Sequence, residues 1–159
     1  MVLITGFTLG GCRPSSSSQL QSEPISITNS HPIKFVGVDS DGGECSYTTK
    51  FTEDGNSLEI QVEANDMRAY VSILKKDIPL SDGFKKDLST PREKTIIFYK
   101  GKKFNWDRRG TTDFLEHSWL DLQIDNQLLI PVEFSMGVGF GPLPSITKGK
   151  CSKLKMADQ

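Results

Sequence analysis

Ser72 and Lys75 stand at the three-residue spacing at which a lysine can deprotonate a serine nucleophile, provided that both side chains lie on one face of a helix. The segment from Arg68 to Leu74, however, carries small or branched apolar residues at every second position, a pattern typical of a strand. Along a strand, residues three positions apart point to opposite faces. We therefore expect no serine–lysine catalysis at this place.

Histidine-based catalysis is the second chemistry to consider, and the chain has only two histidines, His31 and His117. The members of a Ser-His-Asp triad need not be close in sequence, so a small hydrolase that uses His117 stays a hypothesis. The chain contains no Gly-x-Ser-x-Gly motif and no zinc-ligand spacing of cysteine and histidine. We predict that the protein is not an enzyme, and we assign no catalytic residue, no metal ligand and no cofactor.

Two further segments contain residue types that hold ligands in other proteins. Asp39, Asp41 and Glu44 bring carboxylates into one turn, but the further ligands of a calcium loop are not at the required positions, and we predict a solvated turn. The segment from Met136 to Pro142 is rich in glycine but lacks the lysine and the helix of a phosphate loop. It is expected to be an irregular turn or a strand with close backbone approach. A binding loop that carries Phe140 is the alternative.

The elements that must position these residues are strands, because apolar and polar residues alternate over most of the chain. Turn signals such as Asp54-Gly55 separate the alternating segments. Strands are predicted at residues 33–38, 45–51, 57–63, 68–74, 95–99, 104–106, 119–124 and 127–134. The expected fold class is all-β, a single β-sandwich or small β-barrel of about seven or eight mostly antiparallel strands.

Three segments are not predicted as strands. Lys75 to Glu93 contains two prolines and is expected to be a long connection with one helical turn. Asp107 to His117 is expected to be a loop, in which Asp113 and Glu116 have the spacing of a capping box and allow a very short helix. Lys148 to Gln159 is expected to be a polar, basic C-terminal tail.

The N-terminus has the features of a processing signal, because residues 1–11 are uncharged, partly apolar, and end in Leu9-Gly10-Gly11 before Cys12. This sequence resembles the lipobox of bacterial lipoproteins. The resemblance implies that a signal peptidase cuts before Cys12 and that this cysteine then carries lipid. No lysine or arginine precedes Cys12, so we expect the signal peptide to be truncated at its start. A buried N-terminal strand with an ordinary cysteine is the alternative.

Residues 12–31 are predicted to tether a β domain, residues 32–159, to the lipid. The segment is rich in serine, glutamine and proline and cannot bury enough apolar surface to offset the entropy of ordering. About 20 flexible residues have a root-mean-square reach of roughly 25 Å. Arg13, not aspartate, follows the anchor cysteine, so the resemblance implies the outer membrane of the bacterial envelope, facing the periplasm.

The chain has three cysteines, Cys12, Cys45 and Cys151, which is an odd number for an exported protein. A lipidated Cys12 accounts for the odd one and leaves Cys45 and Cys151 to form a disulfide. Such a bridge closes a loop of about 106 residues and contributes up to roughly 4.7 kcal/mol in the chain-entropy treatment. Two separate buried thiols are the alternative.

Charge is balanced over the whole chain, with 19 basic and 20 acidic residues, which argues against a dedicated nucleic-acid binder. Along the chain it is segregated. Residues 39–66 hold eight acidic residues and one basic residue, a net charge of −7, whereas residues 75–109 hold eleven basic and five acidic residues, a net charge of +6. The basic segment contains these candidate partner-binding residues on one predicted hairpin: Lys100, Lys102, Lys103, Phe104, Trp106, Arg108 and Arg109.

This hairpin can bind an anionic partner, such as lipid headgroups, an envelope glycan or an acidic protein face, or it can face the acidic segment of its own chain. In the absence of a catalytic constellation, we expect a lipid-anchored envelope protein that acts as a non-enzymatic binding module. The alternative is a lipoprotein inhibitor or immunity protein that blocks an envelope-attacking enzyme. Its protruding loops would be Lys75 to Glu93 or Gly137 to Pro144.

Overall fold

The computed structural model describes residues 31–110, 116–140 and 145–157. The predicted signal peptide, Cys12 and residues 12–30 of the predicted tether lie outside the described residues. Within them the chain forms a short 3-10 helix, η1 (Lys75–Asp77), and ten strands. The strands are β1 (Ile33–Asp39), β2 (Glu44–Phe51), β3 (Ser57–Ala64), β4 (Met67–Leu74), β5 (Lys85–Asp87), β6 (Glu93–Lys100), β7 (Lys103–Gly110), β8 (Glu116–Ile124), β9 (Pro131–Phe140) and β10 (Ser145–Met156).

All ten strands belong to one sheet, with the order β4-β3-β2-β1-β10-β9-β8-β7-β6-β5. Every neighbouring pair is antiparallel. The all-β, mostly antiparallel fold predicted from the alternation is therefore confirmed. The described residues contain ten strands rather than seven or eight, because β5 and β10 were not expected to be strands.

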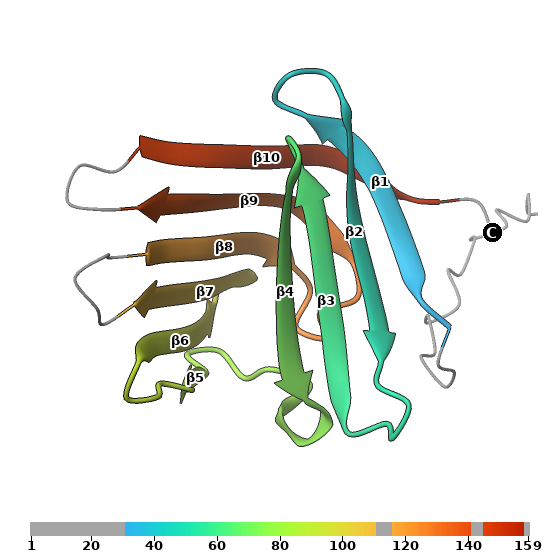
Figure 1. Ribbon diagram of the computed structural model, residues 1–159. Helices are drawn as coiled ribbons and strands as arrows, with labels where there is room; N and C mark the ends of the chain where they lie inside the picture. The colour runs from blue at the N-terminus through green and yellow to red at the C-terminus, as the bar shows by residue number, and fades with distance from the viewer. Residues whose placement is uncertain (1–30, 111–115, 141–144, 158–159) are drawn as a thin grey trace, which may run out of the picture.

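The sheet is curled so that its two halves face each other across one core. Figure 1 shows β1–β4 running upright in front of β6–β10, which run across the view. Side chains alternate between the core and the solvent, so that in β3 every second residue from Leu58 onward is buried. The largest fully buried side chains come from both halves and include Tyr47, Phe104 and Phe134.

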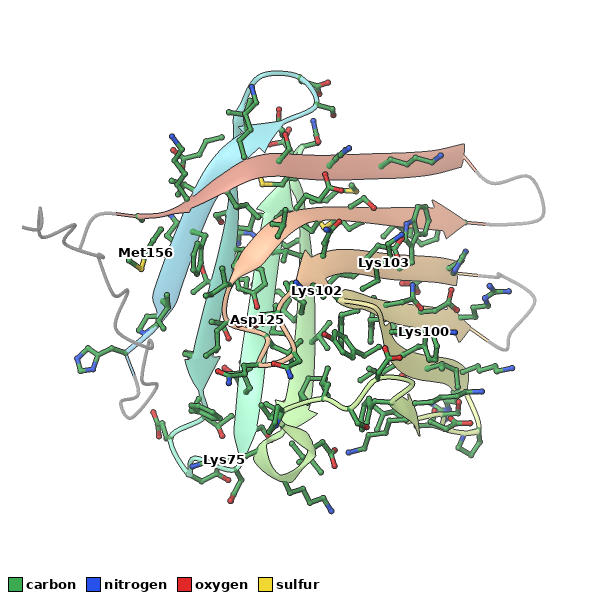
Figure 2. The ribbon with its side chains drawn as sticks, turned by 180° about the vertical axis from the view of Figure 1, so that it is seen from behind. Lys75, Lys100, Lys102, Lys103, Asp125 and Met156 are labelled. Atoms are coloured by element: carbon green, nitrogen blue, oxygen red, sulfur yellow. A yellow bond between two sulfur atoms is a disulfide. The ribbon has the colours of Figure 1, made fainter. Side chains whose placement is uncertain are left out.

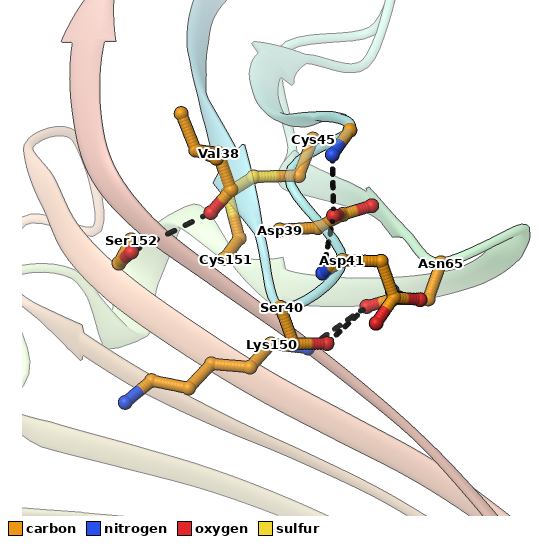
Figure 3. Close-up of a disulfide and its surroundings, with 10 residues drawn as sticks. Val38, Asp39, Ser40, Asp41, Cys45, Asn65, Lys150, Cys151 and Ser152 are labelled. Carbon is orange, nitrogen blue, oxygen red and sulfur yellow. Dashed lines mark hydrogen bonds between the residues drawn. A yellow bond between two sulfur atoms is a disulfide. The ribbon is translucent and has the colours of Figure 1, made fainter.

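A disulfide joins the two halves at the bend. Cys45 on β2 and Cys151 on β10 are bonded, with their Cα atoms 5.8 Å apart, although β1 lies between these two strands in the sheet. The bridge passes Gly37 of β1, where an added Cβ would lie 2.4 Å from the backbone oxygen of Ser152. A β-bulge between Val36 and Val38 sits at the same place and increases the local twist. Figure 3 shows this corner, and the predicted disulfide is confirmed.

The prediction of a polar tail from Lys148 onward is wrong, because this segment belongs to β10, the strand between β1 and β9. Gly149 and Cys151 face the interior, whereas Lys148 and Lys150 are exposed. The lysines hide the alternation in the sequence, since glycine is a weak hydrophobic signal. Two flanking strands satisfy the backbone of β10, so a basic outer face is compatible with this central position.

The connection from β4 to β6 is packed against the domain. Leu80 is buried, and its backbone N–H donates to the carbonyl of Asn126 at 2.9 Å. A helical turn was predicted in the middle of this segment, but Lys85–Asp87 forms β5 and pairs with β6. This pairing gives hydrogen-bond partners to the backbone groups at the outer edge of β6. Residues 85–87 therefore form a strand and not a helical turn.

The predicted loop from Asp107 to His117 is also incorrect where the structure describes it. Strand β7 continues to Gly110, and Glu116 begins β8. Asp113 of the suggested short helix lies outside the described residues.

The segment from Met136 to Phe140 continues β9, which agrees with the expected strand with close backbone approach. A Cβ at Gly137 would lie 2.1 Å from the ring of Trp119, so only glycine fits beneath this ring in its observed position.

Candidate functional site

The β6–β7 hairpin divides the seven predicted partner-binding residues between two faces. Phe104, Trp106 and Arg108 occupy the inward positions of β7, and Phe104 is buried in the core with 1% of its surface exposed. Lys103 and Arg109 alternate with them and are exposed on the outer face. The two aromatic side chains therefore lie on the opposite face of the strand from Lys103 and Arg109.

Three lysines of the predicted site remain available to an anionic partner. Lys100, Lys102 and Lys103 surround the turn of the hairpin, and all three are exposed. None of them forms an ion pair with another described residue. Lys102 adopts a positive φ of 64°, as does its neighbour Gly101 at 56°, which is the geometry of a tight hairpin turn.

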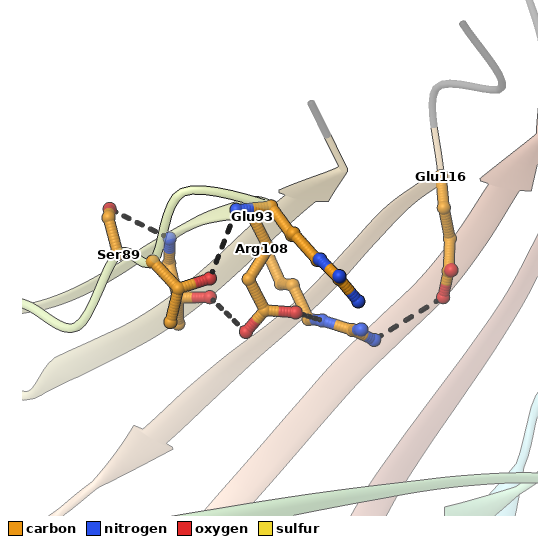
Figure 4. Close-up of polar contacts among 7 residues, drawn as sticks. Ser89, Glu93, Arg108 and Glu116 are labelled. Atoms are coloured by element: carbon orange, nitrogen blue, oxygen red, sulfur yellow. Dashed lines mark hydrogen bonds and ion pairs between the residues drawn. The ribbon is translucent and has the colours of Figure 1, made fainter. Parts of the chain in front are cut away.

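Arg108 is held between two carboxylates. Its Nε donates to Oε2 of Glu93 at 2.8 Å, and its Nη1 lies 3.4 Å from Oε1 of Glu116 (Figure 4). The hydrogen bond to Glu93 raises the pKa of Arg108, and the charges of both glutamates act in the same direction. One guanidinium between two carboxylates is net negative, so Arg108 does not extend the basic surface formed by the three lysines.

The outer face of β7 and β8 contains an Arg–Asp–His arrangement. Asp107 accepts a hydrogen bond from Nε of Arg109 at 3.0 Å, and its Oδ2 lies 2.9 Å from Nε2 of His117. The ring of His117 lies against that of Trp119, with centroids 5.3 Å apart and the ring planes tilted by 38°. In the strand register, His117 is flanked by Arg109 and Gly139. Neither of these described neighbours carries a hydroxyl or thiol, so a histidine–aspartate pair is present without an adjacent nucleophile there.

Asp107 is expected to make folding stability depend on pH. Burial alone would raise the pKa of this carboxyl, but hydrogen bonds from Arg109 and His117 outweigh it and leave the pKa below its ordinary value. A lowered folded-state pKa stabilises the protein above the ordinary carboxyl pKa of about 3.9 and stops doing so as the pH falls through the folded value. Asp107→Asn should lower the free energy of unfolding by about 1 kcal/mol at pH 7.

Urea denaturation of the wild type and of Asp107→Asn from pH 7 down to pH 2.5 measures this effect. The difference between the two proteins should shrink as the pH falls below about 3.9. Asp121 is exposed on the outer face of β8, the face that also carries His117, and Asp121→Asn is the control. At pH 7 this substitution should lower the free energy of unfolding by less than Asp107→Asn does. A difference for Asp107→Asn that stays constant over the whole range contradicts the assignment.

A hollow of about 530 Å³ opens between β4 and the inward face of β6–β9. Trp106 and Met136 give it an apolar wall, and the Arg108 ion pairs form a polar one. Tyr70 of β4 stands at its rim with 61% of its surface exposed. An aromatic wall with a few fixed polar groups is the composition of a binding site.

The strand that borders this hollow is a free edge of the sheet, because within the described residues β4 pairs only with β3. Asn65 and Asp66 form the β3–β4 turn with φ of 50° and 61°, so Ala64 and Met67 close the hairpin as a hydrogen-bonded pair. Hydrogen-bonded pairs alternate along an antiparallel ladder. The backbone N–H and C=O groups of the intervening residues therefore point away from β3; these residues are Arg68, Tyr70, Ser72 and Leu74.

The remaining sequence candidates have local roles in the structure. The Oδ1 atom of Asp39 accepts hydrogen bonds from the backbone N–H groups of Asp41 and Gly43 at 2.9 and 2.7 Å, so this carboxylate stabilises its own turn. Among the described residues, no cluster of histidine, cysteine and acidic side chains is arranged to hold a metal ion. Ser72 lies in β4, whereas Lys75 lies in η1 with its ammonium 5.3 Å from the ring centre of Phe51.

The hollow and the free edge have no recognisable signature in the amino-acid sequence. Glu93 and Tyr70 had no distinguishing local pattern, because both lie in ordinary alternating strands. They come together through pairing between strands that are far apart in sequence. Glu93 and Glu116 stand on either side of the basic hairpin in the sequence, and in the structure both form ion pairs with Arg108.

The fold and the site define an all-β protein with a curled sheet and an open hollow beside β4, the longer of the two strands at the ends of the sheet. No protein-family model matches the chain, and no curated protein or solved structure matches it either. Among the described residues, no helix has the length and hydropathy needed to cross a membrane.

Proposed function

We propose that this protein is a non-enzymatic binding module of the bacterial envelope, anchored through lipid on Cys12. In this proposal the hollow and the edge of β4 together bind an extended segment of another envelope protein. The observation that carries the proposal is the free edge of an eight-residue strand beside a hollow with an aromatic wall. One extended segment of the partner can use both features at once.

The edge of β4 supplies backbone hydrogen bonds. An extended peptide that pairs with β4 becomes an eleventh strand and satisfies the outward N–H and C=O groups of residues such as Tyr70 and Ser72. Long unpaired edges usually carry proline, bulges or many charges that prevent such pairing. Strand β4 has no proline, and Arg68 is its only charged residue.

The hollow supplies side-chain specificity. Alternate side chains of a paired peptide point to one face of the sheet, which here is the face toward the hollow. Trp106 and Met136 suit an apolar side chain, and the fixed carboxylates of Glu93 and Glu116 suit a donor next to it. This chemistry favours a peptide with an apolar residue near a basic or hydroxyl residue.

The two alternatives have less support from the geometry. An inhibitor needs protruding loops, but the segment from Lys75 to Glu93 is packed through Leu80, and Gly137–Phe140 lies within β9. A hydrolase needs a nucleophile near His117, and its register neighbours among the described residues provide none. A peptide-binding role uses features that the structure describes directly.

Ser72→Pro tests the edge pairing, because the N–H of Ser72 points away from β3 and proline removes it without breaking the β3–β4 ladder. A library of ten-residue peptides displayed on beads is the probe. We expect peptides enriched on the wild type to bind Ser72→Pro at least tenfold more weakly, a loss of about 1.4 kcal/mol. The matched control Ser72→Ala keeps the N–H and should retain binding. Equal binding by all three folded proteins, or no enriched peptide at all, refutes the edge as the site.

The lipid anchor has its own test. Cys12→Ala should abolish labelling with radioactive palmitate and release the protein from the membrane fraction of a bacterial host. Labelling that persists in Cys12→Ala excludes this cysteine as the attachment site. The anchor and the peptide site are assayed separately, so either part of the proposal can fail alone.

A further inference from the structure

A second surface with an unbalanced charge lies on the outer face of β10 and β1. Lys148 is opposite Gly137 and Lys150 is opposite Ser135, at positions that alternate with the buried Gly149 and Cys151. The surface, called the lysine strip below, consists of Lys34, Lys148, Lys150, Lys153 and Lys155. All five residues are exposed.

The lysine strip is only weakly neutralised within the domain. Lys150 lies 3.7 Å from a carboxylate oxygen of Glu133. The other four lysines form no ion pair with another described residue. One exposed apolar side chain accompanies them, Val38, with 43% of its surface exposed. A basic strip of this kind is complementary to a surface of anionic headgroups.

The position of the strip connects it to the predicted tether. The backbone N–H of Ala157 donates to the carbonyl of Lys34 at 2.9 Å, so the end of β10 lies beside the start of β1. The predicted tether ends at His31, two residues before β1. The lysine strip therefore begins where the tether would enter the domain. Figure 2 shows Met156 at this end of the sheet, separated from the lysines of the β6–β7 hairpin.

We infer that the lysine strip lies against the anionic phospholipid headgroups of the membrane that holds the lipid anchor. This contact with the membrane rests on the proposed lipid anchor. A tether that enters the domain beside the lysine strip holds this face of the sheet close to the bilayer. The attraction acts over a Debye length of about 8 Å at physiological salt. Contact through the outer face of β10 and β1 leaves the hollow, on the inward face, open to a partner.

Vesicle binding by the unlipidated full chain tests the inference. The background is Cys12→Ser, so that acyl chains do not contribute. The probes are phosphatidylglycerol vesicles, phosphatidylcholine vesicles and soluble polyglutamate. The strip variant replaces Lys34, Lys148, Lys153 and Lys155 by glutamine. The control variant removes the same charge elsewhere, through glutamine at the exposed residues Lys76, Lys85, Arg92 and Lys94.

We expect the Cys12→Ser protein to sediment with phosphatidylglycerol vesicles and not with phosphatidylcholine vesicles. Each lysine near such a surface raises the membrane-binding constant about fivefold. The strip variant should therefore bind phosphatidylglycerol vesicles at least tenfold more weakly. The control variant should lose much less vesicle binding than the strip variant. Circular dichroism checks the fold, and the single variants Lys148→Gln and Lys155→Gln replace the strip variant if it does not fold.

Three results would overturn the inference. These are no preference for anionic vesicles, an equal loss in the strip and control variants, or tighter binding to polyglutamate than to vesicles. The last result would indicate an acidic protein as the partner of the strip. Palmitate labelling and peptide binding are measured separately from vesicle binding, so failure of this inference is distinguishable from failure of the proposed function.

Discussion

Removal of the disulfide by Cys45→Ala together with Cys151→Ala is expected to lower the free energy of unfolding by about 4 kcal/mol. The bridge spans 106 residues of sequence, so its loss frees most of the domain's chain in the unfolded state. It also joins β2 and β10 across β1, the place where the sheet bends. Both cysteines are buried, and the two alanines leave a cavity that adds to the loss.

Urea denaturation of the oxidised wild type and of the double variant measures this loss. Wild type in reducing buffer is the second comparison, because it breaks the bond without changing the side chains, and it should account for most of the difference. A double variant within about 1 kcal/mol of the wild type would contradict a structural role for the bridge at this bend.

Phe104→Ala is expected to cost about 3–5 kcal/mol of unfolding free energy, the range for removing a buried aromatic ring. The ring is buried between the two halves of the sheet, with 1% of its surface exposed. The sequence placed this residue among the partner-binding candidates, because it lies between lysines and a tryptophan. Its inward position on β7 makes it a core residue instead.

The neighbouring residue provides the control for this prediction. Lys103 is adjacent in sequence and exposed on the outer face, so Lys103→Ala should change the unfolding free energy by no more than about 0.5 kcal/mol. Thermal or urea denaturation of both variants gives the comparison. Similar small effects for Phe104→Ala and Lys103→Ala would show that the register of β7 is not the one described.

The sequence predicted the fold class and the disulfide because both depend on local or countable features. Alternation identified eight of the ten strands, and an odd number of cysteines indicated one bridge. Strand β10 was missed since its inward residues include Gly149, which contributes no hydrophobic signal, while its outward lysines suggested a tail. Strand β5 has three residues, too few to show a period.

The candidate site was harder to predict, because it is defined by long-range pairing. Strand β7 runs further than the predicted strand at 104–106, and its period of two separates Phe104, Trp106 and Arg108 on one face from Lys103 and Arg109 on the other. Which face was inward depended on the curl of the sheet, and the edge position of β4 depended on the strand order. Neither property has a local signature, so residues such as Tyr70 could not be distinguished in the sequence.

Site-specific photo-crosslinking in a bacterial host tests the central claim, that the edge of β4 and its hollow bind another envelope protein. A photoreactive phenylalanine analogue replaces Tyr70 at the rim of the hollow in one strain. In the control strain it replaces Phe98, an exposed aromatic residue on the outer face of β6. We predict one dominant covalent adduct from position 70, lost in Ser72→Pro and kept in Ser72→Ala, and no such adduct from position 98. Absence of an adduct at position 70, or the same adducts from both positions, would contradict the account.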